Sequence, residues 1–526
     1  MTEGPATLPA LLAALAARHA SREAVVSARG RLCFGELAAR VDAVAVGLAA
    51  RGVGRGTHVG LLAPNWPEWL VLAFAVWQRG GVLVPLNTLY TARELEHALV
   101  HADVQVLVAV RSFLRHDYAQ ALGAVVAPRL RDIVWLEPPA AGAPVDLGPL
   151  RVPVPRPAAG PVVQPSDTAT IVFTSGSTAA PKGVVHTHGA LVRAAVENAA
   201  VLGIEPDDRT WGYLPFFFAG GLVAVALSTL SRGAAVVLQE VFEPGETLRL
   251  LAAERVTVFF AWPHQAEALL AHPDFPTTRL HLRKGVGANT KWAAALYPPD
   301  HHAVSSFGMT ETPPLCTAWP WDAPREKREG NHGPAVGSRR LRIVDPESGR
   351  PLPLEATGEL CVRGPTLLAG YYKEAARPFD ADGFFHTGDL GWLDADGALH
   401  FVGRAKDVIK TAGANVAAAE VEAVLLEHPA VGAAYVVGVP DPARGENVAA
   451  FVVPKTAVDV AELLAHCRTR LASYKVPRQL WLKREDELPQ KGSGKADKPA
   501  LRAEAARLAG VTAGGDPRRS PPTTKP

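Results

Sequence analysis

The stretch TIVFTSGSTAAPKG, residues 170–183, contains the residue types that a phosphate-binding loop needs. Its apolar start, Ile171-Val172-Phe173, predicts the end of a buried strand. Five small residues follow, and small side chains let backbone N–H groups and hydroxyls converge on one anion: Thr174, Ser175, Gly176, Ser177 and Thr178. Lys182 adds a compact positive charge. The stretch therefore predicts a triphosphate site, and the alternative is a polar strand-to-helix turn with an incidental lysine.

This loop differs from the Walker-type phosphate loop. The Walker pattern places a glycine directly before its lysine, whereas here Pro181 precedes Lys182 and Gly183 follows it. A proline has no N–H group to donate to a phosphate. The sequence therefore predicts a nucleotide site of another class.

Five further motifs follow the loop along the chain: GVGAN (285–289), SSFGMTET (305–312), FHTGD (385–389), FVGRAKD (401–407) and LPQKGSGK (488–495). Together with the loop, they resemble the motifs of the adenylate-forming superfamily, which contains acyl-CoA synthetases, peptide-synthetase adenylation domains and firefly luciferases. The resemblance runs from about Phe34 to Leu501, with the motifs in the family's order. Ala179, Lys491 and Ala418 depart from the family pattern, because they replace the usual glycine, threonine and proline.

The resemblance implies a role for each nucleotide-site residue. Catalytic roles fall on Lys495, on Thr310, which would donate to the α-phosphate, and on Glu311, which would bind Mg²⁺. Asp389, which is expected at a strand end, would accept the ribose hydroxyls, and Arg404 would reach the ribose or the phosphates. The adenine base would lie among five further residues, with the phenylalanine ring stacked on it: Gly287, Ala288, Ser306, Phe307 and Gly308.

The segment WGYLPFFFAGGL, residues 211–222, resembles the part of the family that lines the acyl pocket. Phe217, Phe218, Gly220 and Gly221 are the substrate-binding residues that this resemblance implies. Phe218 stands where relatives carry a histidine, so the pocket wall is expected to be apolar. The segment also lacks the aspartate with which amino-acid-activating relatives hold the substrate amine. The alternative is a plain aromatic core cluster.

The family's chemistry has two steps. A carboxylate attacks the α-phosphate of ATP and gives an acyl-adenylate and pyrophosphate, and a thiol then takes the acyl group. ATP, Mg²⁺ and CoA are the implied cofactors, with a fatty, alicyclic or aromatic acid as substrate. These expectations describe an acyl-CoA ligase. The first alternative to that function is an adenylating enzyme that loads a carrier-protein thiol or performs luciferase-like oxidation. The second is a catalytically weak nucleotide-binding protein. A monomer or homodimer is expected.

Hydrophobic patterns predict the elements that position these motifs. Helical spacing at 8–19, 35–50, 66–78 and 92–101 alternates with short apolar runs at 58–63, 82–85 and 105–110. This order predicts an α/β fold whose large domain contains helix-covered mixed or parallel sheets. A small, mobile α+β domain is expected at residues 405–507, after a large domain at 1–404. The tail, 508–526, is expected to be disordered.

The family resemblance also assigns roles within the small domain. Lys406 would be the hinge between the domains, and Gly413 would lie in the loop that borders the thiol tunnel. Residues 319–332 are charged and contain tryptophan, and they are expected to form a surface loop. His186 and His188, only one residue apart, are expected to pack or hydrogen-bond rather than bind metal.

Composition restricts the protein class. Lys+Arg 54 against Asp+Glu 52 argues against a nucleic-acid partner. The four scattered cysteines make no C-x-x-C pair, so buried free thiols in a reducing compartment are expected. The start of the chain lacks the pattern of a signal peptide, and its most apolar window, 70–86, is interrupted by Gln78-Arg79-Gly80-Gly81. A cytoplasmic protein without an integral membrane segment is expected.

Overall fold

The computed structural model describes residues 4–137, 147–150, 162–174, 181–290, 292–375, 377–411, 414–441, 444–471, 473–490 and 496–510. Two sheets dominate the N-terminal part. The first has six strands in the order β14 (Lys284–Gly285), β13 (Val258–Phe259), β11 (Arg209–Gly212), β12 (Ala235–Leu238), β1 (Glu23–Ser27) and β2 (Gly30–Cys33). The second has seven in the order β19 (Gly370–Tyr371), β10 (Gly183–Thr187), β9 (Thr168–Phe173), β4 (Val82–Pro85), β3 (His58–Leu62), β5 (Val106–Val110) and β8 (Asp132–Leu136).

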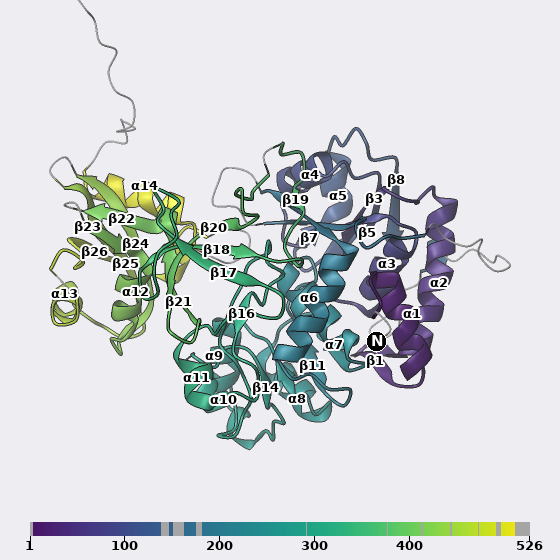
Figure 1. Cartoon of the computed structure of the whole chain (residues 1–526), viewed down its shortest axis with the longest axis horizontal. Helices are drawn as coiled ribbons and strands as arrows, with labels where there is room; N and C mark the ends of the chain where they lie inside the picture. Colours follow the sequence, from purple (N-terminus) through teal and green to yellow (C-terminus); the bar gives the residue numbers. More distant parts are fainter. Residues whose placement is uncertain are drawn as a thin grey trace, which may run out of the picture.

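Helices cover these sheets (Figure 1). The N-terminal part contains α1 (Leu8–His19), α2 (Phe34–Ala50), α3 (Pro67–Gln78), α4 (Ala92–His101), α5 (Tyr118–Gly123), α6 (His188–Val201), a π-helix (Gly220–Leu227), α7 (Ser228–Ser231), α8 (Pro244–Ala253), α9 (Pro263–Ala271), α10 (Ala293–Leu296) and α11 (Arg325–Gly330). Helix α3 is apolar around nearly its whole circumference, and every residue from Pro67 to Trp77 is buried. The indole N–H of Trp77 donates to the carbonyl of Ala169 at 2.9 Å, so this core helix holds β9 in place.

A four-stranded antiparallel sheet follows, in the order β17 (Arg340–Val344), β18 (Gly358–Arg363), β20 (Phe385–Leu393) and β21 (Leu399–Arg404). Two short hairpins complete the strands of this part: β6 (Ser112–Phe113) with β7 (His116–Asp117), and β15 (Ser306–Phe307) with β16 (Thr317–Ala318).

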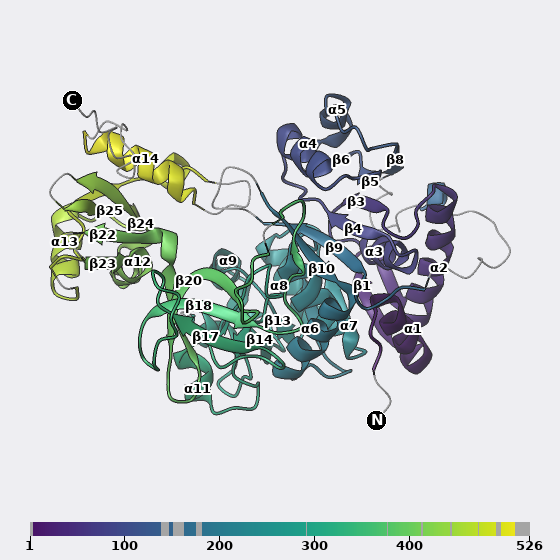
Figure 2. The same ribbon diagram turned by 45° about the horizontal axis from the view of Figure 1, so that its top comes forward.

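The C-terminal part has its own five-stranded sheet, built from β23 (Ala414–Ala417), β22 (Val408–Thr411), β25 (Gly445–Pro454), β24 (Val431–Asp441) and β26 (Gln479–Leu482). Alternate residues of β24 and β25 enter two different apolar clusters, as expected for a strand. Val436 and Ala450 pack with α12 (Ala418–Leu426) and α13 (Val460–Arg468), while Val437 and Phe451 pack with α14 (Lys498–Leu508). Figures 1 and 2 place this sheet at the opposite end of the molecule from α1 and α2.

The predicted architecture is confirmed: an α/β protein with a large N-terminal part of mixed sheets and a smaller C-terminal part. Most predicted elements match the structure within one residue, for example α2, β3 and α3. None of the helices in the described ranges is long and apolar enough to cross a membrane.

Three expectations need correction. Residues 325–330 form α11 rather than a loop, and Arg328 is buried there because it donates to the carbonyls of Ala303, His301 and Ala323. Asp389 lies inside the nine-residue strand β20, not at a strand end. The cysteines are free as expected, but Cys33 is partly exposed because it caps the start of α2 instead of entering the core.

Candidate active site

The adenine and acyl motifs lie at one edge of the six-stranded sheet. Strands β11, β13 and β14 run parallel and side by side, so the segments that follow them meet at their carboxyl ends, where ligands bind in open α/β sheets. Phe217 and Phe218 follow β11, Trp262 follows β13, and Gly287 follows β14. The fold therefore brings the predicted acyl and adenine segments together.

The acyl segment is aromatic. The rings of Phe217 and Phe218 contact each other with centroids 4.6 Å apart, and the ring of Phe218 lies 6.4 Å from that of Trp262. Phe217 is buried, whereas Phe218 and Trp262 are partly exposed. Gly221 leaves no room for a side chain, because a Cβ there would lie 2.2 Å from the carbonyl oxygen of Pro215. Gly220 begins the π-helix and has open space around it.

The adenine segment is fixed by backbone contacts. The N–H groups of Gly287 and Ala288 donate to the carbonyl of Val304 at 2.9 and 3.3 Å, which places this segment beside Ser306 and Phe307. The ring of Phe307 lies 5.4 Å from that of Phe401. A Cβ on Gly308 would lie 1.6 Å from the carbonyl oxygen of Pro314, so only glycine fits this close approach.

The predicted phosphate loop connects two antiparallel strands. Gly183 of β10 pairs with Phe173 of β9, and the N–H of Thr174 donates to the carbonyl of Lys182 at 3.0 Å. The Nζ of Lys182 lies 3.0 Å from a carboxylate oxygen of Glu374. Residues Ser175, Gly176, Ser177 and Thr178 lie outside the described residues, and their assignment stays a prediction.

Glu311 occupies a nearly enclosed position, with its side chain and backbone 7% exposed. Burial raises the pKa of its carboxyl group, while the Tyr371 hydroxyl, Arg404 and Lys182 act in the opposite direction. The Tyr371 hydroxyl donates to Oε1 of Glu311 at 3.0 Å. Among the described residues, no cation forms an ion pair with this carboxylate. A divalent cation beside phosphate oxygens suits this arrangement.

Asp389 and Arg404 face each other across β20 and β21. The Nε atom of Arg404 lies 2.8 Å from Oδ1 of Asp389, and Asp389 is 2% exposed whereas Arg404 is 48% exposed. Burial raises the pKa of Asp389 to about 6 despite the opposing charge of Arg404. Glu311 also raises it, so the predicted ribose and cation ligands lie within electrostatic reach of each other.

Two histidines on β10 and α6 are buried, as expected. His186 Nε2 lies 3.0 Å from the carbonyl oxygen of Thr310, a contact that ties the Thr310-Glu311 turn to β10. Burial lowers the pKa of both His186 and His188 to about 4, so both rings are neutral and Nε2 of His186 is the donor. The prediction of a hydrogen-bonding histidine is confirmed for His186.

The buried His188 gives a prediction about stability. Its pKa is lowered in the folded state, so below about pH 6.5 the unfolded chain binds more protons and unfolding becomes easier. Lowering the pH from 7 to 5 should remove roughly 2 kcal/mol through this one residue. Urea unfolding at the two pH values should therefore show a smaller pH effect in His188→Leu than in the wild type. The control is His264→Leu, because His264 is exposed and its replacement should leave the pH effect as in the wild type. A pH effect in His188→Leu equal to that of the wild type would contradict this account.

The hinge and thiol-side residues are only partly described. Lys406 lies in a 3-10 turn (Ala405–Asp407) that connects β21 to β22. Gly413 and Lys495 lie outside the described residues, so their roles stay predictions.

One group of described side chains has the composition of a metal site. Ligand atoms of Glu359, Cys361 and His386 all lie within 4.8 Å of one another. However, Nδ1 of His386 hydrogen-bonds Oε2 of Glu359 at 2.9 Å, and burial raises the pKa of Cys361 to about 12. The thiol is therefore protonated in the metal-free protein, where Sγ of Cys361 lies 3.5 Å from Nδ1 of His386 and the three side chains interact with one another.

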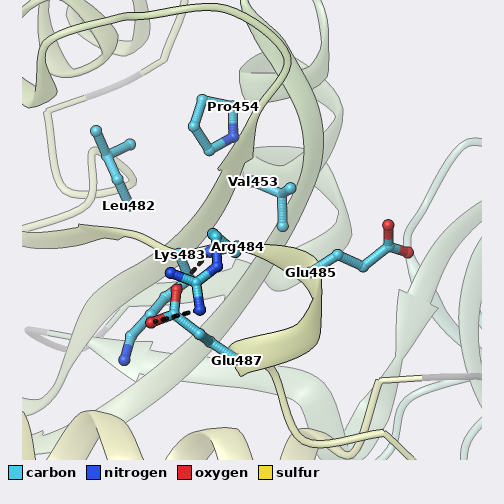
Figure 3. A pocket seen from close by; sticks show the side chains of 7 residues that line it. All are labelled: Val453, Pro454, Leu482, Lys483, Arg484, Glu485 and Glu487. Atoms are coloured by element: carbon cyan, nitrogen blue, oxygen red, sulfur yellow. Dashed lines mark hydrogen bonds and ion pairs between the residues drawn. The ribbon is translucent and has the colours of Figure 1, made fainter.

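Two hollows lie on the small C-terminal part, far along the chain from the acyl motif. One of about 480 Å³ is lined by Glu485, Asp486, Leu488 and Gln490. The other, of about 380 Å³, is drawn in Figure 3, where Arg484 is paired with Glu487 and Glu485 points away from them. The first hollow has an acidic wall, which does not suit an acidic substrate, and the second combines basic Lys483 and Arg484 with acidic Glu485 and Glu487. Neither hollow contains a residue of the predicted acyl segment.

The sequence patterns assign no site role to the GYY segment at 370–372 or to Trp262. Their contacts to Glu311 and Phe218 join residues far apart in the chain, and no local pattern reports such pairs. The aromatic side chains of Tyr371 and Trp262 were the only signal in the sequence that pointed to them.

Comparisons with known proteins identify the family of this chain. The family model for AMP-binding enzymes matches residues 12–372, and the model for the AMP-binding enzyme C-terminal domain matches residues 420–495. A feruloyl-CoA synthase from an Amycolatopsis species is 37% identical over 90% of this chain and 93% of its own length. A sulfoacetate–CoA ligase from Cupriavidus necator is 32% identical over 94% and 97%.

Solved structures give the same result. ATP-bound MatB from Rhodopseudomonas palustris superposes with a TM-score of 0.85 at 30% identity, covering 95% of this chain and 99% of that one. The anthranilate CoA ligase AuaEII with anthranoyl-AMP has a TM-score of 0.85 at 25% identity, covering 97% and 99%. The resemblance stated from the motifs is confirmed, and this chain belongs to the AMP-binding enzyme family.

Proposed function

We propose that this protein is an AMP-forming acyl-CoA synthetase for an apolar, ring-bearing carboxylic acid. The observation that carries the proposal is the gathering of Lys182, Glu311, Asp389 and Arg404, four charged motif residues whose charges act on one another. The relatives are CoA ligases, and a carrier-protein thiol is not favoured as the acceptor. ATP and CoA are therefore the expected co-substrates.

Adenylation brings three negative groups together: the carboxylate, the α-phosphate and the departing pyrophosphate. Lys182 and Arg404 supply fixed positive charge to this region, and Thr310 would donate to the α-phosphate. Mg²⁺ held by the buried Glu311 would neutralise phosphate charge when bound. Asp389 would orient the ribose through its hydroxyls, an interaction that needs the ionised carboxylate.

The ring-bearing substrate class rests on the aromatic segment. Phe217, Phe218 and Trp262 offer flat apolar surfaces at the carboxyl ends of β11 and β13, and aromatic pairs favour offset or edge contacts with another ring. Several relatives act on ring-bearing acids by name, including feruloyl-CoA synthase and an indoleacetate–CoA ligase from Aromatoleum aromaticum. A sulfoacetate ligase among the relatives shows that the scaffold also accepts other acids.

The test is a product assay. Purified protein with ATP, Mg²⁺, CoA and a panel of fatty, alicyclic and aromatic acids should release AMP and pyrophosphate only when an acid is present. Aromatic acids should have the highest kcat/KM. Steady formation of ADP would rule out an adenylating mechanism, and a preference for straight-chain acids would rule out the ring-bearing class.

Exchanging one aromatic wall residue should change acid preference. Phe218→Ala removes the ring that faces Trp262, so bulkier acids should gain kcat/KM relative to the best wild-type substrate, while the Kd for ATP should stay nearly unchanged. Competition assays across the panel measure this ranking. Phe113→Ala, a partly buried phenylalanine on β6, is the control. An unchanged ranking in Phe218→Ala would exclude this position from the pocket.

We also propose the division into domains at residues 1–404 and 405–507. In its support, β21 ends at Arg404, and after three intervening residues β22 of the five-stranded sheet begins at Val408. Alternation of the small domain about Lys406 between the two chemical steps is part of this proposal.

A further inference from the structure

One short segment, residues 368–372, contacts Glu311 and Lys182, two of the four charged residues of the proposed site. Residues 368–372 bond to the strand that follows the phosphate loop, because the N–H groups of Ala369 and Tyr372 donate to the carbonyls of Val185 and Gly183, both at 2.8 Å. The N–H of Leu368 donates to the backbone carbonyl of Glu311 at 2.9 Å. The segment thus fixes the Glu311 backbone relative to β10.

The side chain of Tyr371 joins the same two partners. Its hydroxyl donates to Oε1 of Glu311 at 3.0 Å, and the Nζ of Lys182 lies 4.7 Å from the centre of its ring. The hydroxyl orients a buried carboxylate, and the ring face attracts an ammonium group. A single rigid side chain therefore sets the distance between a negative and a positive charge.

We propose that Tyr371 is a positioning residue for ATP-dependent activation: its hydroxyl presents Glu311 to the divalent cation, and its ring presents Lys182 to the phosphates. This inference rests on the proposed function, since it assigns the cation and the phosphates to those two residues. The Tyr371 hydroxyl engages Oε1 of Glu311, so Oε2 would be the oxygen that binds the cation.

Glu374 completes the arrangement. Its carboxylate pairs with Lys182 at 3.0 Å, and the two side chains are 37% and 41% exposed. An exposed pair of this kind contributes little energy, so phosphate oxygens can replace Glu374 at low cost. The ring of Tyr371 then keeps Lys182 in place during the exchange.

The neighbouring tyrosine provides a matched control. The Tyr372 hydroxyl donates to Asp103 at 2.9 Å, and its ring contacts His58 and His101 instead of a phosphate-site residue. Tyr371→Phe and Tyr372→Phe each remove one hydroxyl that bonds a carboxylate. Any loss specific to Tyr371→Phe is therefore a loss at the phosphate site.

The experiment measures binding without turnover. Calorimetric titration with α,β-methylene-ATP, in the absence of acid, gives a Kd with Mg²⁺ and a second Kd with EDTA. Tyr371→Phe should weaken binding about tenfold with Mg²⁺ and leave the EDTA value unchanged, since one hydrogen bond to a charged group is lost. Tyr371→Leu, which also removes the ring, should weaken binding about threefold further under both conditions. Tyr372→Phe should match the wild type.

The proposal would be overturned if the ratio of the Kd with EDTA to the Kd with Mg²⁺ were the same in Tyr371→Phe and in the wild type. It would also be overturned if the wild-type Kd did not change with Mg²⁺. Thermal unfolding separates a structural effect, because lost packing alone would lower the Tm and leave the ratio of the two Kd values intact. Acid-dependent AMP release by the wild type tests the proposed function separately. If that release occurs and the tyrosine variants behave alike, only the positioning role fails.

Discussion

Lys495→Ala is expected to slow formation of the acyl-adenylate by roughly 10²-fold or more, as removal of one preorganised donor to developing charge does. The family resemblance places this lysine at the α-phosphate during adenylation. Transfer of the acyl group from a supplied acyl-adenylate to CoA should continue in the variant, because that step develops no charge on a departing pyrophosphate. Single-turnover assays of the two half-reactions measure the difference.

A lysine elsewhere in the same domain provides the control for Lys495→Ala. Lys483 pairs with Glu504 at 3.0 Å, so Lys483→Ala removes a positive charge from the small domain without touching a motif. That variant should keep both half-reactions. Equal loss of adenylation in Lys483→Ala and Lys495→Ala would show that overall charge, rather than a residue at the α-phosphate, controls the rate.

Lys406→Pro should produce the opposite pattern. Proline fixes φ at the connection between β21 and β22, where the proposed rotation takes place. We expect the acyl-adenylate to form and accumulate on the enzyme, while CoA is acylated slowly. Rapid-quench measurement of bound adenylate, followed by addition of CoA, reports the two steps separately.

Lys406→Ala is the control, since alanine removes the same side chain but leaves φ free. It should acylate CoA at close to the wild-type rate. If Lys495→Ala and Lys406→Pro each lose both half-reactions in equal measure, alternation of the small domain is wrong for this chain.

The repeating patterns predicted the N-terminal elements well. Helix α1 and strand β4 have the predicted bounds because their apolar spacing reflects burial directly. The prediction of a loop at residues 325–330 was wrong, because this charged run, REKREG, gives no apolar period. Arg328 is buried through hydrogen bonds to the nearby carbonyl of Ala323 and to the distant carbonyls of Ala303 and His301, and the distant pair depends on the folded chain.

The motif residues were predicted more completely than the residues that contact and position them. Glu311, Asp389 and Arg404 were found because their motifs are recognisable, and the structure gathers them. Tyr371 was missed, since it lies 60 positions from Glu311 and its adjacent twin, Tyr372, has the same residue type. Only the pairing of β19 with β10 distinguishes which of the two rings meets the site.

The hairpin geometry of β9 and β10 determines where positive potential can come from. Many nucleotide-binding folds place phosphate at a helix N-terminus, where aligned peptide dipoles amount to about half a unit charge. Here α6 begins only at His188, at the far end of the five-residue strand β10 and about 15 Å from the loop. The dipole of α6 therefore does not act on this loop, and the proposed phosphate site would depend on the loop's own N–H groups and on side-chain cations. A cation on a movable domain can be withdrawn once pyrophosphate has left, whereas a helix dipole cannot.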